Sequence, residues 1–307
     1  MNWDHRRELR SSAPSSGGLR RLGQVLGRIS GVKELPGGVA TSVHAFNARE
    51  DDGSLSPYVL KRFIASDLMP PFEWEGLELA QAAVVPTPVP VLIDQAGDWF
   101  GMPALVMSRL PGTSTYRIGD LAIWTDALAA ALVAIHAAPV PATLPAMLRR
   151  PAYLAEWTPP PGNVDGRLAA VGEVMARLRA RPADEAAILT HGDFHPQNVL
   201  WEGDRISGVI DWCGARYLPR GLDVATCRTS LALSPGGDAA DMFLAAYRRH
   251  SGEALANIAL WDVLCGIDAF EDGLNWLDGI LHVEPAATGA QVVERATAFL
   301  DAALAKC

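Results

Sequence analysis

The sequence predicts an α+β protein of two lobes, in which a small β-rich lobe precedes a larger, mostly helical one. The chain has 307 residues, of which 49% are hydrophobic, and this is enough material for more than one core. Short apolar segments bounded by turn residues lie mainly before residue 110, whereas alanine- and leucine-rich segments dominate after it. Leu110-Pro-Gly112, which combines two helix breakers at this boundary, is the candidate hinge.

Residues 23–110 form the predicted N-lobe. A glycine pair precedes the first apolar segment and a polar turn separates it from the second, so these two segments are expected to form a hairpin. The Arg-rich residues 1–22 lack the apolar run of a secretory signal and are expected to be a flexible lead-in. The predicted elements of the lobe are strands at 39–46 and 58–63, a helix at 72–83, and strands at 91–94 and 104–107.

Residues 111–307 form the predicted C-lobe. Its apolar residues recur at helical spacing, except in 188–211, where short strands and loops are expected. The predicted helices are 120–138, 164–181, 222–233, 238–250, 254–281 with breaks, and 288–305.

The composition excludes several classes of protein. A net charge of −9 and a pI of about 5.3 argue against a nucleic-acid binder and are compatible with a cationic substrate. The four scattered cysteines form no C-x-x-C pair, so we expect neither a zinc ribbon nor a disulfide framework, and a reduced, cytoplasmic setting. No run of about 18 apolar residues occurs, so no membrane partner is expected. We expect a monomer or a weak dimer.

The densest group of polar residues lies between residues 190 and 211. Asp193 and Asn198 are five positions apart and precede an apolar strand, and a second strand ends at Asp211. If residues 203–204 form the tip of a hairpin, Asn198 faces about Val209, and Asp211 lies just past the same end of the ladder. Two oxygen ligands beside a third carboxylate suit Mg²⁺. Asp193 is then left to accept or orient the proton of a substrate hydroxyl.

The order His191-Gly-Asp193, Asn198, Ile210-Asp-Trp212 resembles the motifs of the aminoglycoside phosphotransferase and choline kinase family. The resemblance implies a bilobal protein-kinase-like fold over about residues 23–305. It also implies that Asp193 is the catalytic aspartate, that Asn198 and Asp211 hold Mg²⁺, and that His191 supports the catalytic loop.

The N-lobe adds a set of nucleotide-binding candidates to this resemblance. Leu35-Pro-Gly-Gly38 before a strand resembles the family's nucleotide loop, where the backbone of Gly37 and Gly38 would approach phosphate. Lys61 fits the strand lysine that pairs with the α- and β-phosphates, and strand alternation sends its rival Arg62 to the opposite face.

Further residues of the nucleotide site follow from their positions in the family. Glu73 fits the partner of the strand lysine, and Glu75 and Glu78 are its rivals. Ser108 and Leu110 occupy the place of the kinase hinge, where backbone groups would bind adenine.

Other polar residues have two interpretations each. Asp223 resembles the aspartate that braces the catalytic loop, and an acid at a helix N-terminus is the alternative. His195 is either a substrate contact or a loop residue that satisfies the backbone. Asp268, Glu271 and Asp272 share one helix face, which would bind amino groups of a cationic acceptor or would simply be solvated.

The sequence therefore predicts a small-molecule kinase that transfers the γ-phosphoryl group of ATP to a hydroxyl, with GTP left open. The resemblance suggests an aminoglycoside-like antibiotic as acceptor, and hence antibiotic resistance, or a related cationic metabolite. One alternative is a metal-dependent hydrolase that uses His191, Asp193 and His195, whose spacing resembles that of metal ligands. A second is a non-catalytic, kinase-like nucleotide-binding protein, which the complete set of candidate residues argues against.

Overall fold

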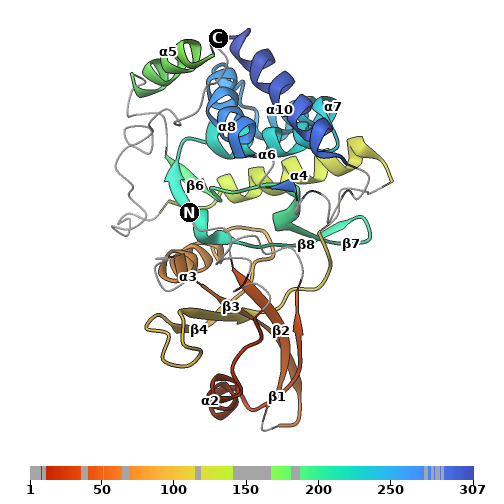
Figure 1. Cartoon of the computed structure of the whole chain (residues 1–307). Coiled ribbons are helices and arrows are strands. Elements are labelled where there is room, and N and C mark those ends of the chain that lie inside the picture. Colours follow the sequence, from red (N-terminus) through yellow and green to blue (C-terminus); the bar gives the residue numbers. More distant parts are fainter. Residues whose placement is uncertain are drawn as a thin grey trace.

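The computed structural model of the chain has a β-rich lobe followed by a helical one, as predicted (Figure 1). Within the described part, no helix is both long and apolar enough to cross a membrane. The residues that the structure describes are 8, 12–35, 41–50, 52–63, 69–114, 119–140, 167–180, 187–272, 276–277, 280, 284 and 287–307.

The N-lobe is built on an antiparallel sheet of five strands in the order β1-β2-β3-β5-β4. Alternate residues of the central strands, including Phe46, Leu60 and Val106, form a core on one face of this sheet. The edge strand β1 is mostly exposed and was not predicted, because it has no alternating apolar pattern. The strands are β1 (Arg28–Glu34), β2 (Ser42–Arg49), β3 (Leu55–Arg62), β4 (Pro90–Asp94) and β5 (Ala104–Ser108).

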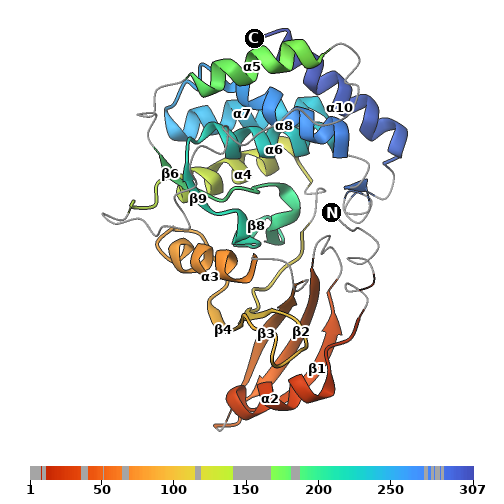
Figure 2. The ribbon, with the colours of Figure 1, turned by 60° about the vertical axis from the view of Figure 1, so that its left-hand side comes forward.

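Helix α2 (Ser16–Leu26) lies where we expected a flexible lead-in to end, so that prediction is wrong for residues 16–22. Leu19, Leu22 and Leu26 recur at helical spacing and pack on the core of the sheet, with Leu22 fully buried. Ser15 caps the helix by accepting a hydrogen bond from the Gly18 N–H. Figure 2 shows α2 against the sheet, at the end of the molecule far from the helical lobe.

Helix α3 (Met69–Ala80) lies between the sheet and the C-lobe (Figures 1 and 2). It begins three residues before the predicted start, because prolines are tolerated in the first turn of a helix. A Cβ atom on Gly76 would lie 2.3 Å from the carbonyl oxygen of Trp212, so only glycine permits this close approach of α3 to the C-lobe.

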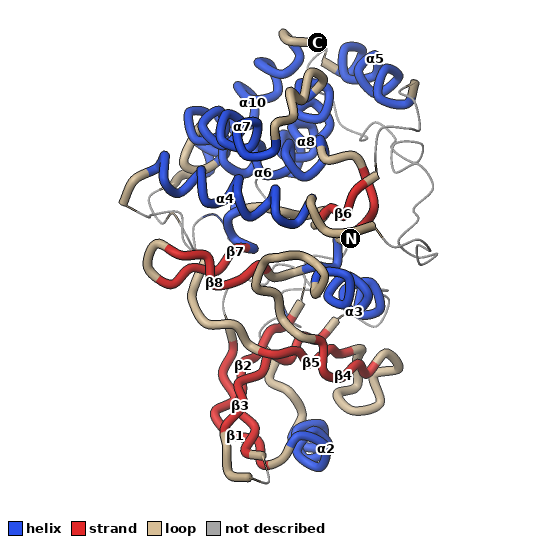
Figure 3. The backbone as a smooth tube through the Cα atoms, turned by 180° about the vertical axis from the view of Figure 1, so that it is seen from behind, coloured by secondary structure: helices blue, strands red, loops and turns tan. Residues whose placement is uncertain are grey.

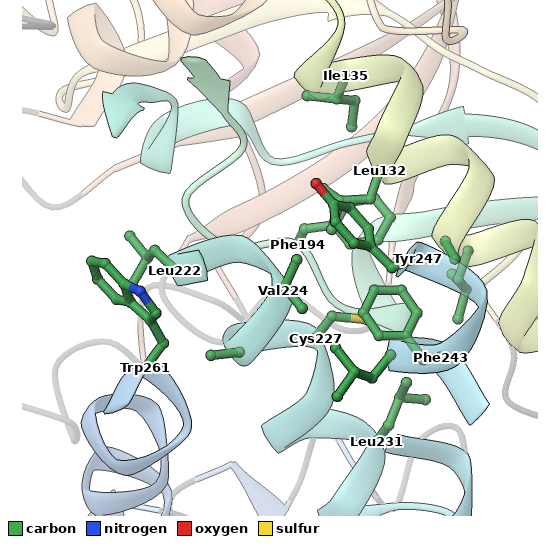
Figure 4. Close-up of a cluster of buried hydrophobic side chains, with 14 of the residues drawn as sticks. Leu132, Ile135, Phe194, Leu222, Val224, Cys227, Leu231, Phe243, Tyr247 and Trp261 are labelled. Atoms are coloured by element: carbon green, nitrogen blue, oxygen red, sulfur yellow. The ribbon is translucent and has the colours of Figure 1, made fainter. Parts of the chain in front are cut away.

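The helices of the C-lobe lie close to their predicted positions and cluster at one end of the molecule (Figure 3). Phe194, from the loop that carries Asp193, enters the core formed by Leu132 of α4, Val224 of α6 and Phe243 of α7 (Figure 4). The loop is thereby fixed to the helices by an apolar anchor. The helices are α4 (Leu121–His136), α5 (Leu168–Arg179), α6 (Gly221–Leu233), α7 (Gly237–Ser251), α8 (Ile258–Asp272) and α10 (Gly289–Leu304).

The polar segment is held by two small antiparallel ladders, β6 with β9 and β7 with β8. Residues 203–204 form the hairpin tip, as predicted, but Ser207 is an extra residue that shifts the register by one. Val199 therefore faces Val209, and Asn198 accepts a backbone hydrogen bond from the Ile210 N–H at 2.9 Å. The elements are β6 (Ile188–Thr190), η2 (Pro196–Asn198), β7 (Val199–Glu202), β8 (Arg205–Val209), η3 (Trp212–Gly214) and β9 (Arg216–Leu218).

The candidate hinge contacts this hairpin. Thr113 and Trp201 exchange two backbone hydrogen bonds of 3.1 and 2.9 Å, which pair the hinge segment with β7. The side chain of Leu110 packs so closely on Gly208 that a Cβ atom there would lie 2.3 Å from it. The connection between the lobes thus touches the hairpin whose ends carry Asn198 and Asp211.

Candidate active site

The centre of the candidate site is the ammonium group of Lys61. Its Nζ atom lies 2.7 Å from Glu73 Oε2 and 2.8 Å from Asp211 Oδ1, so that β3, α3 and the end of β8 meet at one buried charge. The rival Glu78 instead accepts a hydrogen bond from Trp74. Of the three glutamates of α3, Glu73 is the one that pairs with Lys61.

The three groups, Lys61, Glu73 and Asp211, differ in how their pKa values are shifted. Burial opposes the charge of Lys61, but Asp211 and Glu73 outweigh burial and raise its pKa. Burial raises the pKa of Glu73 to about 7, against the opposing effect of Lys61. Burial also acts to raise the pKa of Asp211, but the charge of Lys61 outweighs it and lowers this pKa to about 2. At neutral pH, Asp211 is therefore ionised and Glu73 is close to its titration point.

Asp211 has an unusual backbone and a partly open side chain. Its φ of 67° lies in the left-handed region, which few residues other than glycine adopt. The thiol of Cys213 donates to Asp211 Oδ1 at 3.2 Å, and burial together with the Asp211 charge keeps the pKa of that thiol well above its usual range. The Asp211 side chain nevertheless remains 36% exposed, so a ligand can reach its carboxylate.

Asn198 fixes the loop that carries Asp193. Its Nδ2 atom donates to the Asp193 carbonyl oxygen at 2.9 Å and to Asp193 Oδ2 at 3.3 Å. The Asp193 side chain remains 50% exposed. His195 Nε2 lies 3.6 Å from Asp193 Oδ2 and 3.1 Å from Asn198 Nδ2. Burial lowers the pKa of His195, but the charge of Asp193 outweighs it and raises this pKa.

His191 joins the two halves of the polar segment. Its Nε2–H donates to the Ile210 carbonyl at 3.0 Å, and its Nδ1 accepts the Asp193 N–H at 3.3 Å. The ring is fully buried, and burial lowers its pKa. Because both ring nitrogens are used, His191 has none left for the metal that the hydrolase alternative needs. The described residues also contain no group of three His, Cys, Asp or Glu side chains that would hold a metal ion.

The carboxylate of Asp223 holds the loop that carries Asp193. Its Oδ2 accepts the His191 N–H at 2.6 Å, and its Oδ1 accepts the Gly192 N–H at 2.7 Å. His136 Nε2 lies 3.1 Å from Oδ2, and its Nδ1 lies 2.6 Å from the Tyr247 hydroxyl. A buried chain of hydrogen bonds therefore runs from α7 through α4 and α6 to the loop.

The sequence did not identify His136 and Tyr247 as parts of the site. They lie 111 positions apart, and no spacing rule connects them. One signal was present: His136 is a rare polar residue in an alanine- and leucine-rich helix. Gly192 was also overlooked as a structural requirement. Its φ is 80°, and a Cβ atom there would lie 2.0 Å from the carbonyl oxygen of Gly214.

The other candidate residues are those proposed to contact adenine, phosphate and the acceptor. The Ser108 N–H donates to the Val89 carbonyl at 2.9 Å, so the sheet already uses this donor. Asp268 is exposed on α8. Gly37 and Gly38 lie outside the described residues, as do the side chains of Glu271 and Asp272.

The donor set around Asp211 fits a hard divalent cation. Among the described residues, every hydrogen bond of the Asn198 side chain is made by Nδ2, so its Oδ1 can serve as a ligand, and Asp211 supplies an ionised carboxylate. Mg²⁺ commonly takes one or two such protein oxygens and completes its shell with phosphate and water.

The fold and the site together define a two-lobed, kinase-like protein. The chain belongs to the phosphotransferase enzyme family, whose model matches residues 31–261. This finding confirms the family resemblance inferred from the motifs between His191 and Trp212.

Two curated relatives are homoserine kinases. The protein of Methylocella silvestris is 31% identical over 224 residues, which cover 69% of this chain and 68% of the relative. The protein of Methylobacterium radiotolerans is 28% identical over 282 residues, which cover 85% of this chain and 84% of the relative.

Solved structures share the fold. A complex of aminoglycoside phosphotransferase APH(4)-Ia with AMP-PNP and hygromycin B has a TM-score of 0.64 at 18% identity, covering 95% of this chain and 99% of that one. Amicoumacin kinase hAmiN in complex with AMP-PNP and Ca²⁺ has a TM-score of 0.56 at 17% identity, covering 90% and 88%. These likenesses confirm the bilobal, kinase-like architecture.

Proposed function

We propose that the chain transfers the γ-phosphoryl group of ATP to a hydroxyl group of a small molecule. The observation that carries this proposal is the Lys61 ammonium, held by Glu73 at 2.7 Å and by Asp211 at 2.8 Å. Membership of the phosphotransferase family supports the reaction class. The AMP-PNP complexes of two structural neighbours support an ATP-type nucleotide.

In this proposal Lys61 binds the α- and β-phosphates while Glu73 keeps its ammonium in place. The backbone of Gly37 and Gly38 contacts phosphate, and backbone groups of Ser108 and Leu110 contact adenine. Since the Ser108 N–H is already donated to Val89, Ser108 contributes its carbonyl oxygen instead.

Asn198 and Asp211 are the proposed ligands of Mg²⁺, which neutralises charge on the phosphates when bound. Asp211 now pairs with Lys61 at 2.8 Å, and its low pKa keeps it ionised over the whole working range of pH. The exposed part of its carboxylate is free to meet a cation without breaking the Lys61 pair.

Asp193 is the proposed group that orients the acceptor hydroxyl and receives its proton. Its half-exposed carboxylate can meet a substrate, while its backbone is fixed by Asn198 and His191. His191 and Asp223 hold the loop and do not touch the reacting atoms in this proposal. Most of the rate enhancement then comes from positioning and electrostatics.

For the acceptor, we infer an amino-bearing alcohol, with homoserine as the first candidate. Two curated relatives that cover over two thirds of the chain are homoserine kinases. The aminoglycoside acceptor expected from the resemblance ranks second, because the antibiotic-binding neighbours are only 17–18% identical and share the fold alone. Asp268, Glu271 and Asp272 remain the proposed contacts for the amino group.

The test is ADP release with homoserine, a panel of aminoglycosides, choline and simple sugars, using the wild-type chain and Asp193→Ala. We expect homoserine to give the highest kcat/KM, with no turnover in the variant. Turnover of an aminoglycoside but not homoserine would reverse the ranking of acceptors and leave the kinase proposal intact. Nucleotide binding without turnover of any hydroxyl compound would favour the non-catalytic alternative.

A further inference from the structure

A cavity separate from the candidate active site lies in the C-lobe, between α6, α7, α8 and α10. It has a volume of about 200 Å³ and shares no lining residue with the candidate active site. Its walls carry charged side chains, including Arg228, Asp262, Arg295 and Lys306, together with the ring of Phe299. Nothing in the proposed phosphoryl transfer uses this cavity.

Arg228 is the buried anchor of the cavity, since it is only 3% exposed. Its Nε donates to Asp262 Oδ1 at 3.0 Å, and its Nη1 donates to the Ala240 carbonyl at 2.8 Å and to Asp241 at 3.2 Å. Its Nη2 has no hydrogen-bond partner among the described residues, and it is not sealed from solvent. A fixed guanidinium thus keeps one donor available to an occupant of the cavity.

The lining carries one more cation than carboxylates, since Arg228, Arg295 and Lys306 stand against Asp241 and Asp262. Arg228 is matched by both of these carboxylates, and Arg295 lies 3.8 Å from Glu284, which is outside the lining. The positive charge left for an occupant is therefore mainly that of Lys306, because Asp238 in the first turn of α7 offsets the helix N-terminus that Gly237 brings to the cavity.

The apolar part of the lining defines the body of the occupant. The ring of Phe299 stacks beside Arg228, with 5.8 Å between the guanidinium carbon and the ring centroid. Alanines of α6, α7 and α10 form most of the remaining wall. A bare inorganic ion would leave this wall in contact with water, whereas a short hydrocarbon chain would cover it.

We propose that this cavity binds a small organic anion, with its carboxylate or phosphate group on Arg228 Nη2, Arg295 and Lys306 and its apolar body against Phe299. The site is independent of the proposed kinase reaction. Charge-assisted hydrogen bonds to a fixed guanidinium are strong enough to give a measurable affinity in such a site.

The test is calorimetric titration of the full chain, saturated with ADP and Mg²⁺ so that anion binding at the active site is suppressed. The probes are succinate, glycerol 3-phosphate, inorganic phosphate and the neutral analogue succinamide. We expect succinate or glycerol 3-phosphate to bind, inorganic phosphate to bind more weakly, and succinamide not to bind. Equal affinity for inorganic phosphate would overturn the role of the apolar wall.

Variants separate this site from general charge effects. Arg228→Lys keeps a cation beside Asp262 but loses Nη2, and should weaken binding about tenfold or more. Arg295→Met and Lys306→Met change side chains that are more exposed than Arg228, so they test the site even if Arg228→Lys does not fold. Each should weaken binding severalfold. Arg248→Met, an exposed residue outside the cavity, is the matched control and should bind as the wild type. Binding that survives both Arg295→Met and Lys306→Met unchanged, or no binding of any organic anion, would overturn the proposal.

Discussion

Two neighbouring cations of β3 lie in opposite environments. Lys61 faces the C-lobe and pairs with the carboxylates of Glu73 and Asp211. Arg62 faces the other side of the sheet, where it donates to the carbonyl oxygens of Ser12 and Ala13 and to the Ser42 hydroxyl. No carboxylate pairs with Arg62 in the part of the chain that the structure describes.

The difference indicates which of the two buried cations can bind a ligand. The partners of Lys61 are two carboxylates, and that of Asp211 is 36% exposed, so a phosphate can approach the ammonium from the side of Asp211. The partners of Arg62 are mostly peptide carbonyls of the N-terminal segment, which cannot titrate. We interpret Lys61 as the functional cation and Arg62 as a structural link that holds this segment on the sheet.

The largest expected effect comes from exchanging each cation for methionine. Lys61→Met should lower turnover about 10²–10³-fold, because the charge that holds the α- and β-phosphates in place during transfer is lost. Arg62→Met should change turnover less than about threefold and mainly alter the thermal midpoint. Steady-state ADP release and thermal unfolding of both variants test the comparison, and a similar loss of turnover in both would contradict it.

Removing Asp211 tests the C-lobe side of the Lys61 triad. In Asp211→Ala, the affinity for ATP should no longer rise when Mg²⁺ is added, and turnover should fall about 10²-fold because one proposed ligand is lost. Asp204→Ala, at the exposed hairpin tip, is the control and should retain the Mg²⁺ effect. Nucleotide titrations with and without Mg²⁺ provide the measurement, and an Asp211→Ala chain that still responds to Mg²⁺ would show that the cation is held elsewhere.

The pKa of Glu73 predicts a pH effect of intermediate size. A carboxylate whose pKa is raised to about 7 becomes protonated as the pH falls through 7, and its pair with Lys61 is then lost. Turnover should therefore decline below pH 7 and reach about a tenth of its plateau near pH 6. In Glu73→Gln, turnover should be low throughout and lack this decline. If both chains show the same acid limb in kcat/KM, another group causes it.

The smallest expected effect concerns the hydrogen-bond chain behind the loop. Tyr247→Phe removes the donor to His136 Nδ1 and leaves a buried nitrogen without a partner, which costs about 1–3 kcal/mol of stability. Through Asp223, kcat should fall about threefold while the KM for nucleotide stays constant. Tyr217→Phe removes the hydroxyl of another largely buried tyrosine outside this chain of hydrogen bonds and is the matched control. If kcat is unchanged in Tyr247→Phe, these hydrogen bonds have only a structural role.

Local sequence patterns were sufficient to predict most of the helices and the hairpin tip. Helix α6 (Gly221–Leu233) begins one residue before its predicted start and ends at the predicted residue. The bulge at Ser207 was not predictable, because it depends on how the hairpin packs against Leu110 and Pro111. Strand β1 escaped prediction because an exposed edge strand carries no apolar alternation.

The candidate site was predictable where its residues are close in sequence or fit a known motif. Asp193, Asn198 and Asp211 lie within 19 positions, and hairpin geometry predicted that Asn198 and Asp211 converge. The backbone bond between Asn198 and Ile210 brings Asn198 next to the residue that precedes Asp211, and Asn198 contacts Asp193 directly. His136 and Tyr247 depend on how distant helices pack, so no local rule could indicate their link to Asp223. The acceptor site stays a proposal, because the resemblance specifies the reaction but not the substrate.

The most direct test of the central claim is ³¹P NMR of the reaction with ATP, Mg²⁺ and the best acceptor of the panel, comparing the wild-type chain with Asp193→Ala. We expect the wild type to form one phosphate ester for each ADP. Asp193→Ala should bind ATP within about threefold of the wild-type affinity but form ester about 10²–10⁴ times more slowly. Full ester formation in Asp193→Ala would contradict the role of Asp193, and inorganic phosphate as the sole product of the wild type would contradict the kinase reaction.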